Sequence, residues 1–182
     1  MANSSPGLVC THDHPDPFEI FRFGRFTNVD PVALLAHLRD PRIARHLPLL
    51  PDDPDAAFVS QLIATKEACW ERDGLGHWAI LHEGEYAGFG GFQREGDEWD
   101  FGLVLRPKYF RQGKDIALQA FDWARHHTQI EEVTFLLPLS RSERALQRLG
   151  ARPMGISELL GISFRKWCLN LVSFQTRRAL DE

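Results

Sequence analysis

Residues 103–120 read LVLRPKYFRQGKDIALQA, and they join the end of an apolar strand to the start of a helix. The cations between the two are Arg106, Lys108, Arg111 and Lys114. Backbone N–H groups at the start of a helix lack helical partners, and the helix dipole adds positive potential there. A basic strand-to-helix turn that contains a glycine (Gly113) therefore predicts a site for a phosphate group.

Composition restricts what this turn can bind. The chain has 182 residues, 43% hydrophobic and 25% charged, which is typical of one globular domain. Its formal net charge of -4 disfavours a nucleic-acid partner, so the basic turn indicates a small anion. Three cysteines without a CxxC pattern (Cys10, Cys69, Cys168) favour free thiols in a reducing compartment. With no signal peptide and no run of about 18 apolar residues, we expect a cytoplasmic protein without a membrane partner.

The first part of the chain predicts one strand followed by helices. Residues 18–26 alternate partly between Phe and Arg, which is typical of a strand. Three Asp-Pro pairs follow: Asp30-Pro31, Asp40-Pro41 and Asp53-Pro54. Each offers an N-cap acceptor before a proline at the first helical position, where the missing N–H costs nothing. They predict helices over 31–38, about 41–46 and about 54–73.

The middle of the chain changes to the period of a sheet. Strands are predicted at 78–81, 86–93 and 99–105, joined by short turns into an antiparallel meander. The glycines of the second strand (Gly88, Gly90 and Gly91) indicate a bulge or close packing, or alternatively room for a ligand. A helix with an apolar stripe then runs from the basic turn to His127, and an apolar strand follows at 133–137. This strand–helix–strand order implies a parallel crossover and hence a mixed sheet.

The last part of the chain predicts a short helix and a final strand or hairpin. Ser140 and Glu143 have the spacing of a capping box, and Gly150 ends the helix. The final strand or hairpin occupies about 161–173. Residues 18–173 are thus expected to form a single domain, with 1–17 a flexible lead-in and 174–182 a polar tail. His12 and His14 flank Asp13 in the lead-in, but no further ligand cluster completes a set, so we predict no metal site.

Three short motifs in this order resemble those of the GNAT acetyltransferases, and the branch of ribosomal-protein N-terminal acetyltransferases in particular. QGKDIA at 112–117 is similar to the coenzyme A loop, except that Asp115 replaces the central glycine. DFGLVL at 100–105 resembles the fourth strand of that family, and SERALQRLG at 142–150 resembles its late helix. The resemblance implies an α/β (α+β) acyl-CoA N-acyltransferase fold, with a mixed, mostly antiparallel sheet of six to seven strands flanked by helices.

The same resemblance implies how acetyl-CoA would be bound. The coenzyme A loop would hold the pyrophosphate through main-chain N–H groups and basic side chains, at Arg111, Gln112, Gly113, Lys114, Asp115, Ile116 and Ala117. The main chain of the fourth strand would bind pantetheine and polarise the thioester, at Leu103, Val104 and Leu105. A helix start with solvated basic residues is the alternative interpretation of the loop.

Two residues match the positions of the proton-transfer groups. Asp100 alternates with apolar neighbours and is the predicted base, with Glu98 in reserve, because a carboxylate beside a ligand cleft can have a raised pKa. The alternative is an acid on a solvent face. Ser142 is the predicted acid for the leaving thiolate, and a first-turn helix serine is its alternative. His46, Trp70, His77 and Trp78 are candidates to line the acceptor side.

The leading hypothesis is an acetyl-CoA-dependent N-acetyltransferase in which a primary amine attacks directly in a ternary complex. The amine would belong to a protein N-terminus or to a small molecule, and the protein would be a monomer or a homodimer. The competing hypothesis is a non-catalytic binding protein of the same fold. It rests on Asp115, whose carboxylate would place negative charge near a pyrophosphate.

Overall fold

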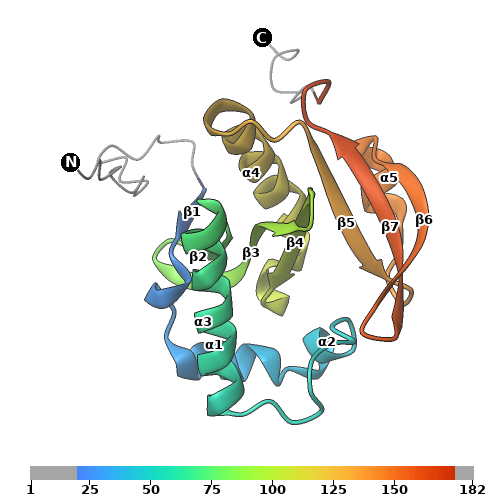
Figure 1. Cartoon of the computed structure of the whole chain (residues 1–182). Helices are drawn as coiled ribbons and strands as arrows, with labels where there is room; N and C mark the ends of the chain where they lie inside the picture. The colour runs from blue at the N-terminus through green and yellow to red at the C-terminus, as the bar shows by residue number, and fades with distance from the viewer. Residues whose placement is uncertain (1–19, 175–182) are drawn as a thin grey trace.

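One seven-stranded sheet, in the order β1-β2-β3-β4-β5-β7-β6, organises the chain in the computed structural model, which describes residues 20–174 (Figure 1). The strands are β1 (Phe21–Gly24), β2 (His77–His82), β3 (Glu85–Glu95), β4 (Glu98–Leu105), β5 (Glu132–Pro138), β6 (Arg152–Leu159) and β7 (Ile162–Asn170). All neighbouring strands are antiparallel except β4 and β5, which are parallel. The predicted mixed, mostly antiparallel sheet and its crossover are therefore confirmed.

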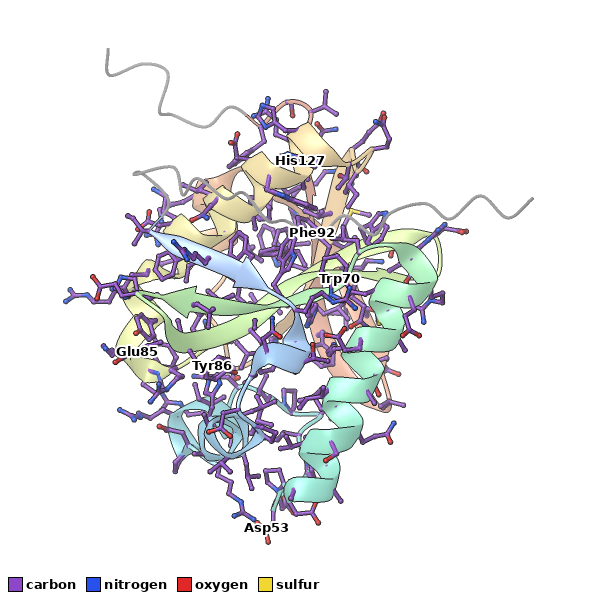
Figure 2. All side chains as sticks on the ribbon, turned by 90° about the vertical axis from the view of Figure 1, so that its left-hand side faces the viewer. Asp53, Trp70, Glu85, Tyr86, Phe92 and His127 are labelled. Atoms are coloured by element: carbon purple, nitrogen blue, oxygen red, sulfur yellow. The ribbon has the colours of Figure 1, made fainter. Side chains whose placement is uncertain are left out.

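Helices cover both faces of this sheet (Figure 1). They are α1 (Pro31–Leu38), α2 (Pro41–Ala44), α3 (Ala56–Asp73), α4 (Gly113–His127) and α5 (Arg144–Leu149), with 3-10 turns η1 (Phe26–Asn28) and η2 (Pro107–Gln112). The α1 and α3 side buries Leu34, Val59 and Phe89. The α4 side buries an aromatic cluster in which Phe92, labelled in Figure 2, contacts Phe101, and Phe101 contacts Phe121.

Two of the three Asp-Pro pairs start helices as predicted. The Asp30 carboxylate accepts the Val32 N–H at 3.0 Å, and the Asp40 carboxylate accepts the Arg42 N–H at 2.9 Å. The third prediction is wrong, because Asp55 rather than Asp53 caps α3, through a 2.8 Å bond from the Phe58 N–H. Asp53 instead pairs with Arg39 at the surface.

The glycines of β3 allow the neighbouring strand to approach closely. A Cβ at Gly88 would lie 2.4 Å from the Val104 carbonyl oxygen, and one at Gly90 would lie 2.2 Å from the Gly102 carbonyl oxygen. The register of β2 against β3 also shifts between Ile80 and Leu81, opposite this segment. Both the predicted close packing and the predicted bulge are present.

Three local predictions are wrong. Phe26 does not extend the first strand, because it is fully buried against Phe89 and opens η1. The capping box at Ser140 does not form, since α5 begins only at Arg144 and Glu143 pairs with Arg165 (2.7 Å). Strand β6 was not expected, because its Pro and Gly interrupt the strand pattern; an edge strand tolerates them.

Four predicted features lie outside residues 20–174: the lead-in (1–17), most of the polar tail (174–182), the start of the first strand and the His12–Asp13–His14 group. Within the described part of the chain, no helix is long and apolar enough to cross a membrane. The same residues contain no group of three or more His, Cys, Asp or Glu side chains placed to hold a metal ion.

Candidate functional site

Strands β4 and β5 separate soon after they meet. Within the described residues their only register pair is Asp100 with Thr134. Beyond it, Phe101 to Leu105 remain paired with β3 alone, and Phe135 to Pro138 remain paired with β7 alone. The β5-facing side of the β4 main chain, at Leu103, Val104 and Leu105, therefore has no strand partner. Main-chain groups freed in this way can bind the amides of a ligand that enters between two strands.

The basic turn after β4 is held in place by hydrogen bonds to the main chain of β3 and within the turn. The Arg106 N–H donates to the Ala87 carbonyl (2.8 Å), and its guanidinium donates to the Tyr86 carbonyl (3.1 Å). The Tyr109 ring is buried at 2% exposure, and its N–H donates to the Arg106 carbonyl. Arg106 and Tyr109 thus fix the path along which η2 leads into α4.

The first turn of α4 is the place where the sequence predicts that an anion binds. It follows η2 directly, and its N-cap residue, Gln112, makes no side-chain cap. Arg111 and Lys114 are exposed beside the N–H groups of Gly113, Lys114 and Asp115. Asp115 is also exposed and adds a negative charge to this first turn, where the predicted pyrophosphate would lie.

The last two residues of the predicted loop, Ile116 and Ala117, have buried side chains in the hydrophobic core. Their contribution to a ligand site is therefore limited to shaping the helix that presents the first turn. The orientation of α4 depends on this packing.

Asp100 lies partly buried on the α3-facing side of β4, and burial raises its pKa to about 7. Thr134 Oγ1 lies 3.4 Å from Asp100 Oδ1 and 3.3 Å from the Trp99 carbonyl, so it donates weakly to either oxygen. The neighbouring Phe101 and Trp99 pack on the opposite, α4 face. A carboxyl group that titrates near neutral pH can accept a proton during a reaction. Glu98, the reserve candidate, is ion-paired with Lys166.

Ser142 lies well away from Asp100. It is exposed just before α5, where its Oγ faces the Arg144 N–H at 3.4 Å. It lines a surface depression of 550 Å³ beyond the end of β5, together with Arg165. At roughly 3.3 Å per residue, the stretch of β5 from Thr134 to Pro138 alone spans about 13 Å. Asp100 and Ser142 therefore serve different parts of any shared ligand.

The acceptor candidates divide between core and surface. Trp78 is 4% exposed within the aromatic core, and Trp70 donates its indole N–H to the His77 carbonyl (2.9 Å; Trp70 is labelled in Figure 2), so both are structural. Burial lowers the pKa of His77 well below its usual value. His46 lies 3.4 Å from Ser140 Oγ, which connects the helical segment after α1 to the loop after β5.

Two residues near Asp100 were missed from the sequence. Thr134 carries a hydroxyl in a predicted strand (133–137) that is otherwise apolar. This polar residue was the one sequence feature that could have indicated a role near the site. Lys66 carries no signal in the sequence, because it is one polar residue of a helix, yet its ammonium group donates to Gln93, which pairs with Asp100. The β4–β5 register brings Thr134 to Asp100, and the packing of α3 against β3 brings Lys66 to Gln93.

Comparison with known proteins gives one clear family match. Residues 21–152 match the family model described as an acetyltransferase (GNAT) domain. No curated protein matches the chain.

Several solved structures share the fold at low sequence identity. An acetyltransferase from Agrobacterium tumefaciens is 16% identical with a TM-score of 0.69, covering 84% of this chain and 91% of its own. AAC(6')-Ib, in complex with paromomycin and acetyl-CoA, is 13% identical with a TM-score of 0.68 and coverages of 87% and 96%. A Salmonella typhimurium acetyltransferase that modifies the N-terminal serine of ribosomal protein L7/L12 is 13% identical with a TM-score of 0.65 and coverages of 82% and 93%.

Proposed function

Because the chain belongs to the GNAT acetyltransferase family, we propose that it transfers an acetyl group from acetyl-CoA to a primary amine by direct attack in a ternary complex. The observation that carries the proposal is Asp100, a partly buried carboxyl group with a pKa of about 7 at the point where β4 and β5 part. The acceptor would be a protein N-terminus or a small-molecule amine. Two structural neighbours, an aminoglycoside acetyltransferase and an enzyme that modifies an N-terminal serine, support this range.

The residues divide the work of acyl transfer between them. Acetyl-CoA would supply the acetyl group as an activated thioester. Arg111, Lys114 and the N–H groups at the start of α4 would hold its phosphates, and the main chain of residues 103–105 would align and polarise the acyl carbonyl. Asp100 would accept the proton that the amine loses as the C–N bond forms, through a bridging water because an aspartate is short.

The leaving group completes the proton balance. As the C–S bond breaks, the sulfur takes the bonding electron pair and needs a proton, or leaves as a thiolate. Ser142 is the residue that we propose to return that proton, which requires the sulfur to lie towards the end of β5; otherwise the thiolate takes its proton from water. A thiolate is a good leaving group, so we expect the reaction to depend less on Ser142 than on Asp100.

The free Cys69 and Cys168 support a reducing, cytoplasmic setting for this chemistry.

A screen of amines with acetyl-CoA, read by release of free thiol, tests the proposal. With an accepted amine, kcat/KM should rise with pH through about 7 as Asp100 ionises, and Asp100→Asn should lower it by about 10²–10⁴-fold. Asp97→Asn, in the exposed turn between β3 and β4, is the matched control. Full activity of Asp100→Asn across the pH range would remove Asp100 from the reaction.

Asp115 favours a second candidate, a GNAT-fold protein that no longer binds its coenzyme productively. The carboxylate lies in the first turn of α4, where the pyrophosphate would bind. Calorimetry with acetyl-CoA separates the two. Binding by the wild type supports the enzyme, whereas no binding by the wild type, restored in Asp115→Gly, supports the non-catalytic protein.

A further inference from the structure

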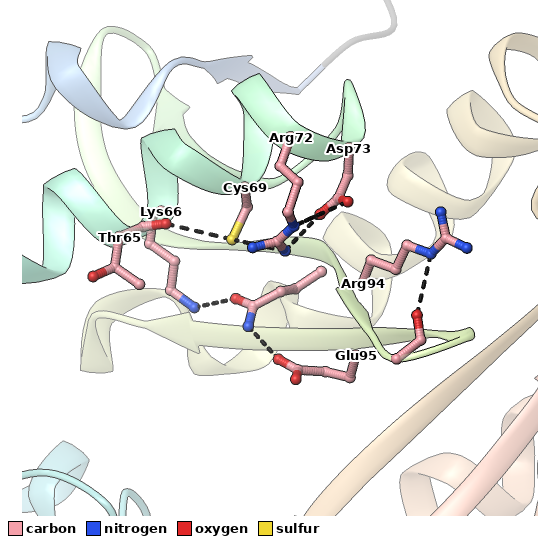
Figure 3. A network of polar contacts seen from close by, with 9 residues as sticks. Thr65, Lys66, Cys69, Arg72, Asp73, Arg94 and Glu95 are labelled. Atoms are coloured by element: carbon pink, nitrogen blue, oxygen red, sulfur yellow. Dashed lines mark hydrogen bonds and ion pairs between the residues drawn. The ribbon is translucent and has the colours of Figure 1, made fainter.

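Lys66 has an unusual environment for a lysine. It lies on the sheet-facing side of α3, is partly buried, and within residues 20–174 forms no ion pair with a carboxylate. Its Nζ donates to Gln93 Oε1 at 2.5 Å, and this contact is drawn in Figure 3. A partly buried ammonium group without a carboxylate partner costs free energy unless its charge acts favourably on a neighbouring group.

Gln93 connects Lys66 to Asp100. Gln93 and Asp100 are directly opposed in the β3–β4 ladder, and opposed residues of an antiparallel pair project from the same face with Cβ atoms about 5 Å apart. The Gln93 amide nitrogen is itself directed to Glu95, as Figure 3 also shows. Gln93 is therefore held at both ends of its amide, and it places the Lys66 ammonium group on the sheet face from which Asp100 also projects.

The charges that face Asp100 come from every element packed around it. Lys66 approaches from α3, Glu95 from β3 and Lys166 from β7, while Thr134 on β5 donates a hydrogen bond. Lys166 is neutralised by its own ion pair with Glu98. Lys66 is thus the cation near Asp100 whose charge is not already compensated in the described part of the chain.

Resting on the proposed function, we propose that Lys66 is a positioning residue for Asp100, whose charge, placed through Gln93, favours the ionised carboxylate that the reaction requires. Burial disfavours that ionised form, and the charge of Lys66 opposes this effect. Burial also lowers the pKa of Lys66, while Cys69 on its own helix, Glu95 and Asp100 raise it. Buried His77 on β2 lies near enough for Lys66 to lower its pKa further.

The sign of the effect on Asp100 follows from the charge. Without Lys66, the carboxyl group keeps its burial and the repulsion from Glu95 but loses an attracting cation, so its pKa rises above about 7. A rise of about one unit leaves about tenfold less carboxylate at pH 6. Activity that requires this carboxylate would fall by the same factor at that pH and recover at high pH.

NMR titration of the Asp100 carboxyl carbon, assigned by its loss in Asp100→Asn, tests the inference without any turnover. The wild-type midpoint should lie near 7, and Lys66→Met should raise it by about one unit. Lys66→Arg keeps the charge and should restore the wild-type midpoint to within a few tenths of a unit. Lys166→Met should raise it less, because Lys166 attracts the Asp100 carboxylate less than Lys66 does.

Arg72→Met is the matched control, because Arg72 is a cation of the same helix that pairs with Asp73. Its midpoint should equal that of the wild type. An unchanged midpoint in Lys66→Met, with native thermal unfolding, overturns the inference whether or not any amine is acetylated. If Lys66→Met does not fold, a midpoint in Lys66→Gln equal to the wild type overturns it instead. A raised midpoint without turnover of any amine supports the placement of Lys66 and overturns the proposed function.

Discussion

Asp100 combines a chemical requirement with a cost in stability. Burial raises its pKa to about 7 from the usual aspartate value of 3.8, so the folded protein holds this proton more tightly than the unfolded chain does. Ionising it at neutral pH therefore weakens the fold. Residues tuned for proton transfer commonly carry such a cost.

Replacing Asp100 with Asn should stabilise the protein at pH 8. The folded-state pKa is above the unfolded value, so the ionisation cost is absent below about pH 4 and complete above about pH 7. The raised pKa sets an upper limit of about 4 kcal/mol, and we expect about 2 kcal/mol after solvent screening. Urea unfolding at pH 5 and at pH 8 measures the gain.

The gain should shrink towards zero as the pH falls to about 4, because Asp100 is then protonated in both states. Asp97→Asn should show no such pH-dependent gain, since Asp97 lies in an exposed turn. A gain that is equal at pH 5 and pH 8 would mean that the carboxyl group is not destabilised by ionisation.

Among the helices, α3 begins at a different cap from the one that the Asp-Pro pattern predicts: Asp55 instead of Asp53. Asp55→Ala removes the acceptor of the Phe58 N–H and should lower the free energy of unfolding by about 1 kcal/mol. Asp53→Ala removes only an exposed pair with Arg39 and should cost less than about 0.5 kcal/mol. Chemical unfolding of both variants tests this order, and a larger loss for Asp53→Ala would restore the Asp-Pro pattern as the helix start.

Among the strands, β3 should not accept a side chain at Gly90. A Cβ there would meet the Gly102 carbonyl oxygen at 2.2 Å and Leu103 Cα at 2.9 Å, and neither backbone atom can move alone. Gly90→Ala should cost about 3 kcal/mol in unfolding free energy. Gly102→Ala, in the facing strand, meets no atom within 4 Å and should cost much less. Similar losses in the two variants would contradict the close approach.

The elements that could be predicted from sequence are those whose signal is local. Asp30 and Asp40 each precede a proline and cap a helix, so both helices could be predicted. The meander could be predicted from the alternation of apolar and polar residues and from its short turns. Phe26 and β6 could not be predicted, because a distant contact with Phe89 ends one strand and pairing with β7 creates the other. For the same reason the residues near Asp100 were predicted only in part. Thr134 reaches Asp100 through the β4–β5 register, and Lys66 approaches from α3 through its hydrogen bond to Gln93.

For the whole molecule, acetyl-CoA should raise the unfolding temperature. A ligand at 100 times its dissociation constant adds about 2.7 kcal/mol, or about 5–10 °C for a domain of this size. Arg111→Met and Lys114→Met should reduce the shift at a fixed concentration, because each removes a cation beside the start of α4. Differential scanning fluorimetry measures this shift in unfolding temperature. Arg42→Met is the control, because Arg42 pairs with Asp40 away from α4. An undiminished shift in both test variants would place the ligand elsewhere.

The single register pair between β4 and β5 has a consequence for how the molecule unfolds. In residues 20–174 the backbone hydrogen bonds of the sheet form two ladders, one from β1 to β4 and one of β5, β7 and β6, and these meet only at Asp100 and Thr134. Cooperativity between them must then pass through side chains, chiefly the aromatic core against α4, rather than through the sheet. The two ladders form separate candidate units of local opening, and a ligand that bridges them would join them into one unit of amide exchange.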